Sequence, residues 1–361
     1  MQQQYPISAD ITRAHTLPAS FYKSTAIYEA QKEQVFAKSW QMVGNTHDLD
    51  GTKNCFPFRL FPDYLEEPLV LTRDKNEVLH CLSNVCTHRG NLLVEESRKS
   101  AHLSCKYHGR CFHLDGKFRS MPMFTEAQNF PMASDNLPEL ALAKLGSLLF
   151  TSLDPSHDFS VYFNPIKNRL SWFPFDQLKE HETYTKTYYV NANWALYCDN
   201  YLEGFHVPFV HPTLNQALDF GSYSTEIFDY CNLQLGIAKP NEVSFDLPPS
   251  SVDYGKSIYA YYFWVFPNMM FNFYPWGLSL NIVQPIAINK TRIIFKTYLL
   301  EGHSAEEFAN TAIDATELED EAIVESVQIG MQSRLYQSGR FSPKMEQGVH
   351  HFHRLLSQAM H

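Results

Sequence analysis

The segment CTHRG (residues 86–90) and the later segment CKYHG (residues 105–109) are the most informative part of this sequence. Sixteen residues lie between His88 and Cys105, so the pattern reads C-x-H-x16-C-x2-H. Each segment offers one thiolate and one imidazole, both good metal ligands, and each contains a glycine shortly after its histidine. The pattern therefore predicts two tight loops that clamp a metal centre.

A binuclear iron-sulfur cluster explains this mixed ligand set better than zinc does. Cys86 and Cys105 would bind one iron, and His88 and His108 would bind the other. Neutral imidazoles in place of two thiolates raise the reduction potential, which suits a one-electron relay. Zinc is the alternative, but zinc fingers usually keep their cysteines together and their histidines together, whereas each loop here is mixed. The sequence predicts a [2Fe–2S] cluster.

The composition sets limits on the other classes of function. The 361 residues carry a net charge of −10, which argues against a nucleic-acid partner because phosphate binding depends on Lys and Arg. We find no signal peptide and no membrane span, and we expect a cytoplasmic protein. The other five cysteines fit small buried hydrophobic positions, although Cys111 could lie near the cluster; they are Cys55, Cys81, Cys111, Cys198 and Cys231.

The chain is long enough for two domains. Residues 1–40 contain a predicted helix over 20–40, capped near Ser24 or Thr25, and we expect this segment to pack on the second domain. Residues 41–155 read as short strands separated by turns, hence a small all-β domain. Residues 156–361 mix strands with helices, the longest over about 305–337, which favours an α+β domain with helices on an antiparallel sheet.

A second group of metal-ligand residues lies between Asn193 and Pro212. If this segment is helical, Asp199, Glu203 and His206 are spaced i, i+4 and i+7 and share one face. Pro208 would then break the helix and let His211 turn back toward His206. Two histidines and one carboxylate form a facial set that leaves open positions on Fe(II), as in non-haem iron oxygenases.

The carboxylate of this set must come from elsewhere in the chain. Asp320 continues an apolar stripe with Val324, Val327 and Met331, and a carboxylate aimed at a core is costly unless it is paired or bound to metal. Glu317 lies on the same stripe and is the rival ligand. A solvated acidic turn is the other interpretation of this region.

Together these motifs resemble the Rieske non-haem iron oxygenases. The two loops look like a Rieske domain, and residues 193–211 look like the family segment N-W-x(5)-N-x2-[D/E]-x2-H-x4-H. The resemblance implies a Rieske domain placed before a catalytic domain, with an acidic bridge at Glu203 and Asn200 close to the iron. It implies iron ligation by His206, His211 and Asp320. Two positions depart from the common pattern: Ala195, where many members have Lys, and Glu203, where ring-hydroxylating dioxygenases generally have Asp.

The resemblance also implies the partners. Members form head-to-tail homotrimers and activate O2 with electrons from NAD(P)H. This sequence has no GxGxxG nucleotide-binding motif, so a separate flavin and iron-sulfur reductase is expected. An alternative function, from a different functional class, is a Rieske electron-transfer protein without oxygenase activity.

For the substrate, Glu203, the segment Tyr107–Arg110 and the C-terminal sequence resemble the choline, glycine betaine, carnitine and stachydrine branch. A small quaternary ammonium substrate, hydroxylated or N-dealkylated, is therefore expected, with hydroxylation or O-demethylation of an aromatic or heterocyclic compound as the alternative. Aromatic faces attract such cations. The candidates for the pocket wall are Tyr259, Tyr261, Phe263, Trp264, Phe271, Phe273, Tyr274 and Trp276.

Overall fold

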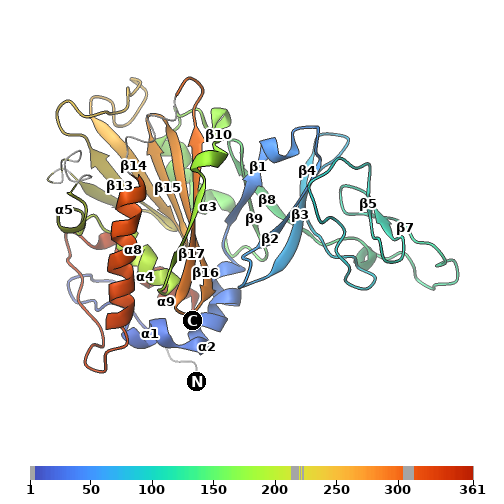
Figure 1. Cartoon of the computed structure of the whole chain (residues 1–361), viewed down its shortest axis with the longest axis horizontal. Helices are drawn as coiled ribbons and strands as arrows, with labels where there is room; N and C mark the ends of the chain where they lie inside the picture. Colours follow the sequence, from blue (N-terminus) through green and yellow to red (C-terminus); the bar gives the residue numbers. More distant parts are fainter. Residues whose placement is uncertain (1–4, 213–218, 220, 222, 304–312, 361) are drawn as a thin grey trace. The chain divides into compact units, whose positions relative to one another are not determined.

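The computed structural model describes residues 5–212, 219, 221, 223–303 and 313–360. Two compact units are present: Lys38–Ser156 forms one, and Met1–Ala37 with His157–His361 forms the other. Both contain antiparallel sheets, and the longer helices belong to the larger unit, which confirms the expected α+β class (Figure 1). None of the helices in the described part of the chain has the length and apolar character that a membrane crossing requires.

The smaller unit consists of a six-stranded and a three-stranded antiparallel sheet. The larger sheet has the order β1-β9-β8-β4-β3-β2, so the first and last strands of the unit pair with each other. The small sheet has the order β5-β6-β7. The bounds are β1 Gln41–Asn45, η2 Thr46–Leu49, β2 Cys55–Leu60, β3 Glu67–Arg73, β4 Leu79–Ser83, β5 Leu103–Ser104, β6 Cys111–Phe112, β7 Phe118–Ser120, η3 Ala133–Asp135, β8 Glu139–Leu145 and β9 Leu148–Ser152.

An antiparallel sheet of eight strands forms the centre of the larger unit. Its order is β10-β17-β16-β15-β14-β13-β12, and β11 also pairs with β17. The aromatic and β-branched residues of these strands suit a pleated, buried surface. The bounds are β10 Lys179–Glu180, β11 Lys186–Val190, β12 Ser224–Ile227, β13 Cys231–Ile237, β14 Ile258–Val265, β15 Met269–Tyr274, β16 Gly277–Ala287 and β17 Lys290–Leu299.

Alternating side chains of this sheet pack against different parts of the chain. Phe271 and Phe273 contact Phe163 and Phe173, with ring centroids 5.8 and 5.1 Å apart. Trp264 instead packs on Phe352 of the C-terminal helix at 5.2 Å. Because successive side chains of a strand point to opposite faces, both faces of the sheet are covered.

The helices of the larger unit are mostly short. Figure 1 shows α4, α8 and α9 grouped beside the large sheet. The bounds are α1 Ala19–Lys23, α2 Thr25–Gln31, the π-helix η1 Lys32–Phe36, α3 Phe159–Arg169, η4 Phe175–Gln177, η5 Glu182–Tyr184, α4 Trp194–Tyr201, α5 Val207–Val210, α8 Ile313–Gly330 and α9 Gln347–Ala359.

Two expectations about helices need correction. The predicted helix over 20–40 is three shorter segments, and Ser24 ends the first and caps the second by accepting a hydrogen bond from the Ile27 N–H at 3.3 Å. The long C-terminal helix ends at Gly330 rather than near residue 337, and residues 304–312 lie outside the described part. On this helix Val327 is 40% exposed, and Gln328 takes the buried position instead. The buried stripe therefore keeps the predicted Glu317, Val324 and Met331, and Gln328 takes the place of Val327.

Gly348 sets the approach of α9 to the end of α4. A Cβ at this position would lie 2.3 Å from the carbonyl oxygen of Leu202. We expect Gly348→Ala to destabilise the protein by about 2 kcal/mol, because the backbone must shift to relieve the overlap. This cost corresponds to a fall of about 4–8 °C in the melting temperature of the larger unit. Gly330→Ala is the matched control, since a Cβ there meets no atom within 4 Å; an equal loss in both variants would contradict the steric explanation.

Candidate metal centres

The two cysteine-histidine loops of the smaller unit have the same backbone structure. In the first, the Cys86 N–H donates to the carbonyl of Asn91 at 2.8 Å, and the Gly90 N–H donates back to the Cys86 carbonyl at 3.0 Å. The same pair of bonds recurs around Cys105 and Gly109 in the second loop. Both glycines have φ near +70°, a conformation that other residues adopt only with strain. This geometry explains why each segment contains a glycine four residues after its cysteine.

The four predicted ligands lie together at the tips of these loops. The rings of His88 and His108 are 4.7 Å apart, and the buried Nδ1 of His88 has no hydrogen-bond partner within the described part of the chain. Burial raises the pKa of Cys86, and the adjacent Cys105 thiol raises it further. Burial alone would raise the pKa of Cys105, but the amides of Tyr107 and His108 outweigh it and lower the pKa. The two thiols and an imidazole nitrogen that lacks a partner fit a bound cluster.

Neighbouring residues hold the second loop in place. Arg110 is buried, and its guanidinium pairs with Asp135 at 2.6 Å. The same group lies 5.1 to 5.6 Å from the ring centres of Phe112, Phe118 and Phe130. The sequence did not single out this support, because the partners of Arg110 come from later in the chain.

All seven cysteines are free thiols. The expectation of buried positions is correct for Cys55, Cys81, Cys198 and Cys231. It is wrong for Cys111, which is partly exposed in β6, with its sulfur 3.2 Å from the Ser104 hydroxyl.

In the larger unit, the residues of the predicted iron site do not lie on one continuous helix. The Asn193 side chain caps α4 by accepting from the Ala195 N–H at 3.0 Å, and α4 ends at Tyr201. Glu203 and His206 therefore lie beyond its end, and Pro208 lies in the first turn of the next helix, α5, rather than breaking one.

Asp199 does not share a face with these residues, so the predicted i, i+4, i+7 arrangement is wrong. Its carboxylate accepts from the Tyr22 hydroxyl at 2.8 Å and lies 2.8 Å from Nε2 of His353. It anchors α4 to the N-terminal segment and to α9.

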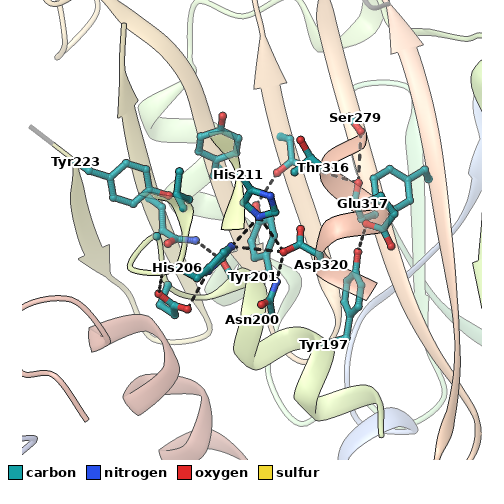
Figure 2. Close-up of a pocket in the computed structure, with 18 of the residues that line it drawn as sticks. Tyr197, Asn200, Tyr201, His206, His211, Tyr223, Ser279, Thr316, Glu317 and Asp320 are labelled. Carbon is teal, nitrogen blue, oxygen red and sulfur yellow. Dashed lines mark hydrogen bonds and ion pairs between the residues drawn. The ribbon is translucent and has the colours of Figure 1, made fainter. Parts of the chain in front are cut away.

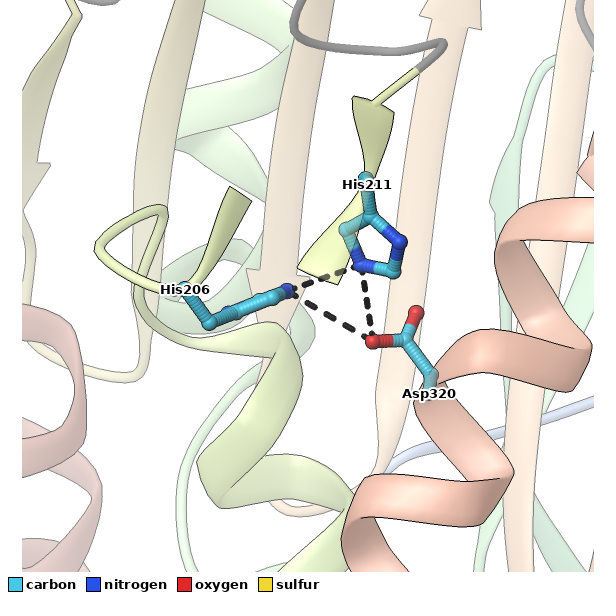
Figure 3. A group of neighbouring side chains, drawn as sticks. All are labelled: His206, His211 and Asp320. Carbon is cyan, nitrogen blue, oxygen red and sulfur yellow. Dashed lines mark hydrogen bonds and ion pairs between the residues drawn. The ribbon is translucent and has the colours of Figure 1, made fainter. Parts of the chain in front are cut away.

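The turn after α4 nevertheless brings His206, His211 and Asp320 together (Figure 3). Nε2 of His206 lies 3.1 Å from Nε2 of His211. Oδ1 of Asp320 lies 3.0 Å from Nε2 of His211 and 3.5 Å from Nε2 of His206. One potential ligand atom from each residue falls within a group no more than 4.8 Å across.

The far sides of both rings contact carboxylates, which orients them for metal binding. Nδ1 of His206 lies 2.9 Å from Glu203, and Nδ1 of His211 lies 2.7 Å from Glu319. A carboxylate only accepts, so each neutral ring places its proton on Nδ1 and turns an unprotonated Nε2 toward Asp320. Three acceptor atoms that face one another repel unless a cation lies between them. The donor set therefore fits a bound metal ion.

Asp320 and Glu319 also influence the protonation of His211. Burial alone would lower the pKa of His211, but Asp320 and Glu319 outweigh burial and raise it. Asn200 donates to Oδ1 of Asp320 at 2.5 Å, which places it beside the site as expected. Glu319 was missed by the sequence analysis.

Glu317 has a different environment from Asp320. Its Oε2 accepts a hydrogen bond from the Tyr197 hydroxyl at 2.5 Å (Figure 2). The residue is only 3% exposed. It does not belong to the group of converging ligand atoms. The geometry thus favours Asp320 over Glu317 as the third ligand.

A cavity of about 120 Å³ adjoins the three converging residues. Of the eight aromatic candidates, Tyr259 and Tyr274 line it, whereas the other six are not among the described lining residues. Tyr223 and Tyr262 were missed. The polar sheet residues that also line the cavity are Gln234, Asn272, Ser279 and Asn281.

Comparisons with known families agree with both units. Residues 39–131 match the Rieske [2Fe-2S] domain. Residues 175–361 match the ring hydroxylating alpha subunit (catalytic domain). This pair of domains confirms the expected oxygenase class and its cluster and non-haem iron, and neither a structural zinc site nor a bare electron carrier fits it.

Similar proteins span nearly the whole chain. A choline monooxygenase of Arabidopsis thaliana, named as chloroplastic, is 30% identical and the match covers 96% of this chain and 83% of that one. The carnitine monooxygenase oxygenase subunit of Escherichia coli (strain K12) is 29% identical, with coverage of 97% and 95%. Because the plant relative is named as chloroplastic, the cytoplasmic location stays a prediction.

Solved structures share the fold. The quaternary ammonium Rieske monooxygenase CntA in complex with L-carnitine superposes with a TM-score of 0.78 at 24% identity, covering 99% of this chain and 100% of that one. Naphthalene 1,2-dioxygenase from Rhodococcus sp. gives 0.73 at 18% identity, covering 96% and 94%. The chain belongs to the ring-hydroxylating oxygenase alpha-subunit family, with a Rieske domain preceding the catalytic domain.

Proposed function

We propose that this chain is an oxygenase component that hydroxylates or N-dealkylates a small quaternary ammonium compound. Hydroxylation of one C–H bond consumes one O2, two electrons and two protons and releases one water. The proposed mononuclear Fe(II) ligands are His206, His211 and Asp320. The proposed cluster ligands are Cys86, His88, Cys105 and His108.

The observation that carries this proposal is the group of tyrosine rings in the cavity. Tyr259 and Tyr262 each stand nearly perpendicular to Tyr274, with ring centroids 6.0 Å apart. Trp276 stacks on Tyr274, with ring centroids 5.0 Å apart. Burial raises the pKa of Tyr262 and of Tyr274 above the ordinary range, so both remain neutral phenols. Neutral ring faces around a cavity attract an alkylammonium cation.

The relatives support the same substrate class. The proteins described above are named as choline and carnitine monooxygenases. CntA has been solved with L-carnitine and with gamma-butyrobetaine. The shared feature of these compounds is a quaternary ammonium group, which is the group that the tyrosine rings of this chain would recognise.

Each nearby residue has a role that its contacts support. When bound, Fe(II) supplies O2 activation and the cluster supplies electrons. Glu203 and Glu319 hold the protons of the two histidines on Nδ1, so that Nε2 faces the metal position. Asn200 holds the Asp320 carboxylate in place. The tyrosine rings form the aromatic part of the cavity wall.

The proposal also assigns a role to each domain and names the partner proteins. Residues 41–155 would form the electron-accepting domain, residues 156–361 the oxygen-activating domain, and residues 1–40 would pack on the latter. The sequence has no GxGxxG motif, so NAD(P)H oxidation is assigned to a separate flavin and iron-sulfur reductase. The active form would be a homotrimer; inter-subunit electron transfer is described for a related quaternary ammonium Rieske monooxygenase.

Oxygen uptake tests the proposed substrate class. The reconstituted protein, supplied with a generic reductase and NADH, is assayed against choline, glycine betaine, L-carnitine and a set of aromatic acids. We expect at least one quaternary ammonium compound to stimulate uptake and to give a stoichiometric oxidised product, and no aromatic acid to do so. Stimulation by aromatic acids alone would favour the ring-hydroxylase alternative, and stimulation by neither group would refute both substrate assignments.

A further inference from the structure

The cavity beside the proposed iron ligands is acidic. Three carboxylates line it, those of Glu203, Glu317 and Asp320. None of the described residues that line it is a lysine or an arginine. The parts of the sequence outside the described residues contain no lysine or arginine either. An anionic group that entered this cavity would therefore meet neither of the two side chains that usually neutralise it.

Glu317 is the carboxylate that the metal site does not use. It is almost fully buried, and the Tyr197 hydroxyl donates to its Oε2. Burial raises the pKa of Tyr197 well above its usual value, and the negative charge of Glu317 raises it further. Tyr197 therefore remains protonated and donates its hydroxyl hydrogen to the Glu317 carboxylate.

Charge balance indicates which ligand this cavity would accept. Glu319 adds a fourth carboxylate behind His211, so the two positive charges of Fe(II) would offset two of the four and leave the site with net negative charge. Glu317 precedes Asp320 by three residues on α8, so their Cβ atoms lie about 5–6 Å apart. A cation next to Glu317 would therefore lie close to the metal-binding residues, in the same cavity that the tyrosine rings line.

We infer that the substrate is a monocation without a carboxylate, such as a trimethylammonium alcohol. Glu317 determines this specificity. This inference rests on the quaternary ammonium oxygenase activity proposed above. A zwitterion such as a betaine would bring its own carboxylate into an acidic cavity. Burying that charge without a cationic partner is costly. The same carboxylate would also be repelled by Glu317.

Ligand binding tests this inference independently of turnover. Isothermal titration calorimetry under anaerobic conditions on the Fe-loaded protein would compare choline, glycine betaine, L-carnitine and 3,3-dimethyl-1-butanol, the uncharged analogue of choline. We expect choline to bind at least about tenfold more tightly than the two zwitterions and the neutral alcohol, a difference of about 1.4 kcal/mol.

Variants of α8 assign the specificity to Glu317. Glu317→Gln should weaken choline binding by at least about tenfold and change binding of the neutral alcohol by no more than about twofold. Glu325→Gln is the matched control, because it removes the same charge from the same helix. Its Oε1 accepts from the backbone and side chain of Asn191 at 2.8 Å, which a glutamine can preserve. Iron and cluster contents are measured in each variant.

The outcomes separate this inference from the proposed function. Zwitterions that bind as tightly as choline would overturn the inference and leave the quaternary ammonium oxygenase standing. Failure of every quaternary ammonium compound to bind would overturn both. An unchanged choline affinity in Glu317→Gln, or loss of iron from that variant, would remove Glu317 from substrate recognition.

Discussion

The Asp320→Ala variant is expected to lose its mononuclear iron while its [2Fe–2S] cluster stays fully loaded. Oδ1 of Asp320 is the only carboxylate oxygen of the described residues in the converging group, next to the two histidine nitrogens. Alanine would leave two imidazoles, and loss of a direct ligand should cost more than the 10–100-fold in metal affinity that is usual for a residue behind a ligand. Oxygen uptake should fall to background. Metal analysis and the visible spectrum of the cluster provide the two measurements.

Glu317→Gln is the informative comparison for this prediction. Glu317 lies one turn earlier on the same helix and hydrogen-bonds to Tyr197 rather than to the histidines. This variant should retain iron as well as the cluster. If it loses iron and Asp320→Ala retains it, the two acidic residues have been assigned to the wrong roles. If Asp320→Ala loses the cluster as well, the substitution has disturbed the whole protein.

The cluster loops could be predicted from sequence because their determinants are local. Each loop needs a cysteine, a histidine two or three residues later and a glycine that can adopt a positive φ, and all of these lie within five residues. The order of the ligands also separated this site from a zinc finger. The alternation of strands and helices was likewise sufficient for the α+β class.

The geometry of the iron site was less accessible, because it depends on where helices end and how they pack. Helical spacing placed Asp199 on one face with Glu203 and His206. However, α4 ends at Tyr201, and the turn that follows points the later side chains in directions that helical spacing does not predict. Glu319 contacts His211 across 108 residues of sequence. No local pattern distinguishes it from the other acidic residues of that helix.

The aromatic residues of the sheet that line the cavity were also hard to predict from the sequence. Residues of one strand alternate between faces, so an aromatic strand supplies candidates for two different environments. Tyr262 lines the cavity, whereas the neighbouring Tyr261 donates to Asp253 at 3.1 Å elsewhere. Polarity was the signal available in advance: Asn272, Ser279 and Asn281 interrupt otherwise apolar strands, and all three line the cavity. Buried polar residues need partners or a ligand to contact, and they therefore mark the functional face.

Glu203→Gln is expected to retain both metal centres and to slow substrate oxidation by about 100-fold. Glu203 uses two oxygens for His206: Oε1 lies 2.9 Å from the ring Nδ1, and Oε2 accepts from the backbone N–H at 3.0 Å. Glutamine offers one oxygen, so its amide group must face one of these two donors. The ring then loses either its charged partner or its orientation. Steady-state oxygen uptake and the rate of cluster reoxidation in a single turnover would measure the effect.

Glu319→Gln separates a special role of Glu203 from ordinary support of a histidine. Glu319 contacts His211 through a single oxygen at 2.7 Å, and a glutamine can replace that acceptor. We therefore expect Glu319→Gln to slow turnover by no more than about tenfold. Equal losses in the two variants would reduce Glu203 to a support for its histidine. Failure of Glu203→Gln to load either metal would make the residue structural, because a residue that couples two centres should leave both of them assembled.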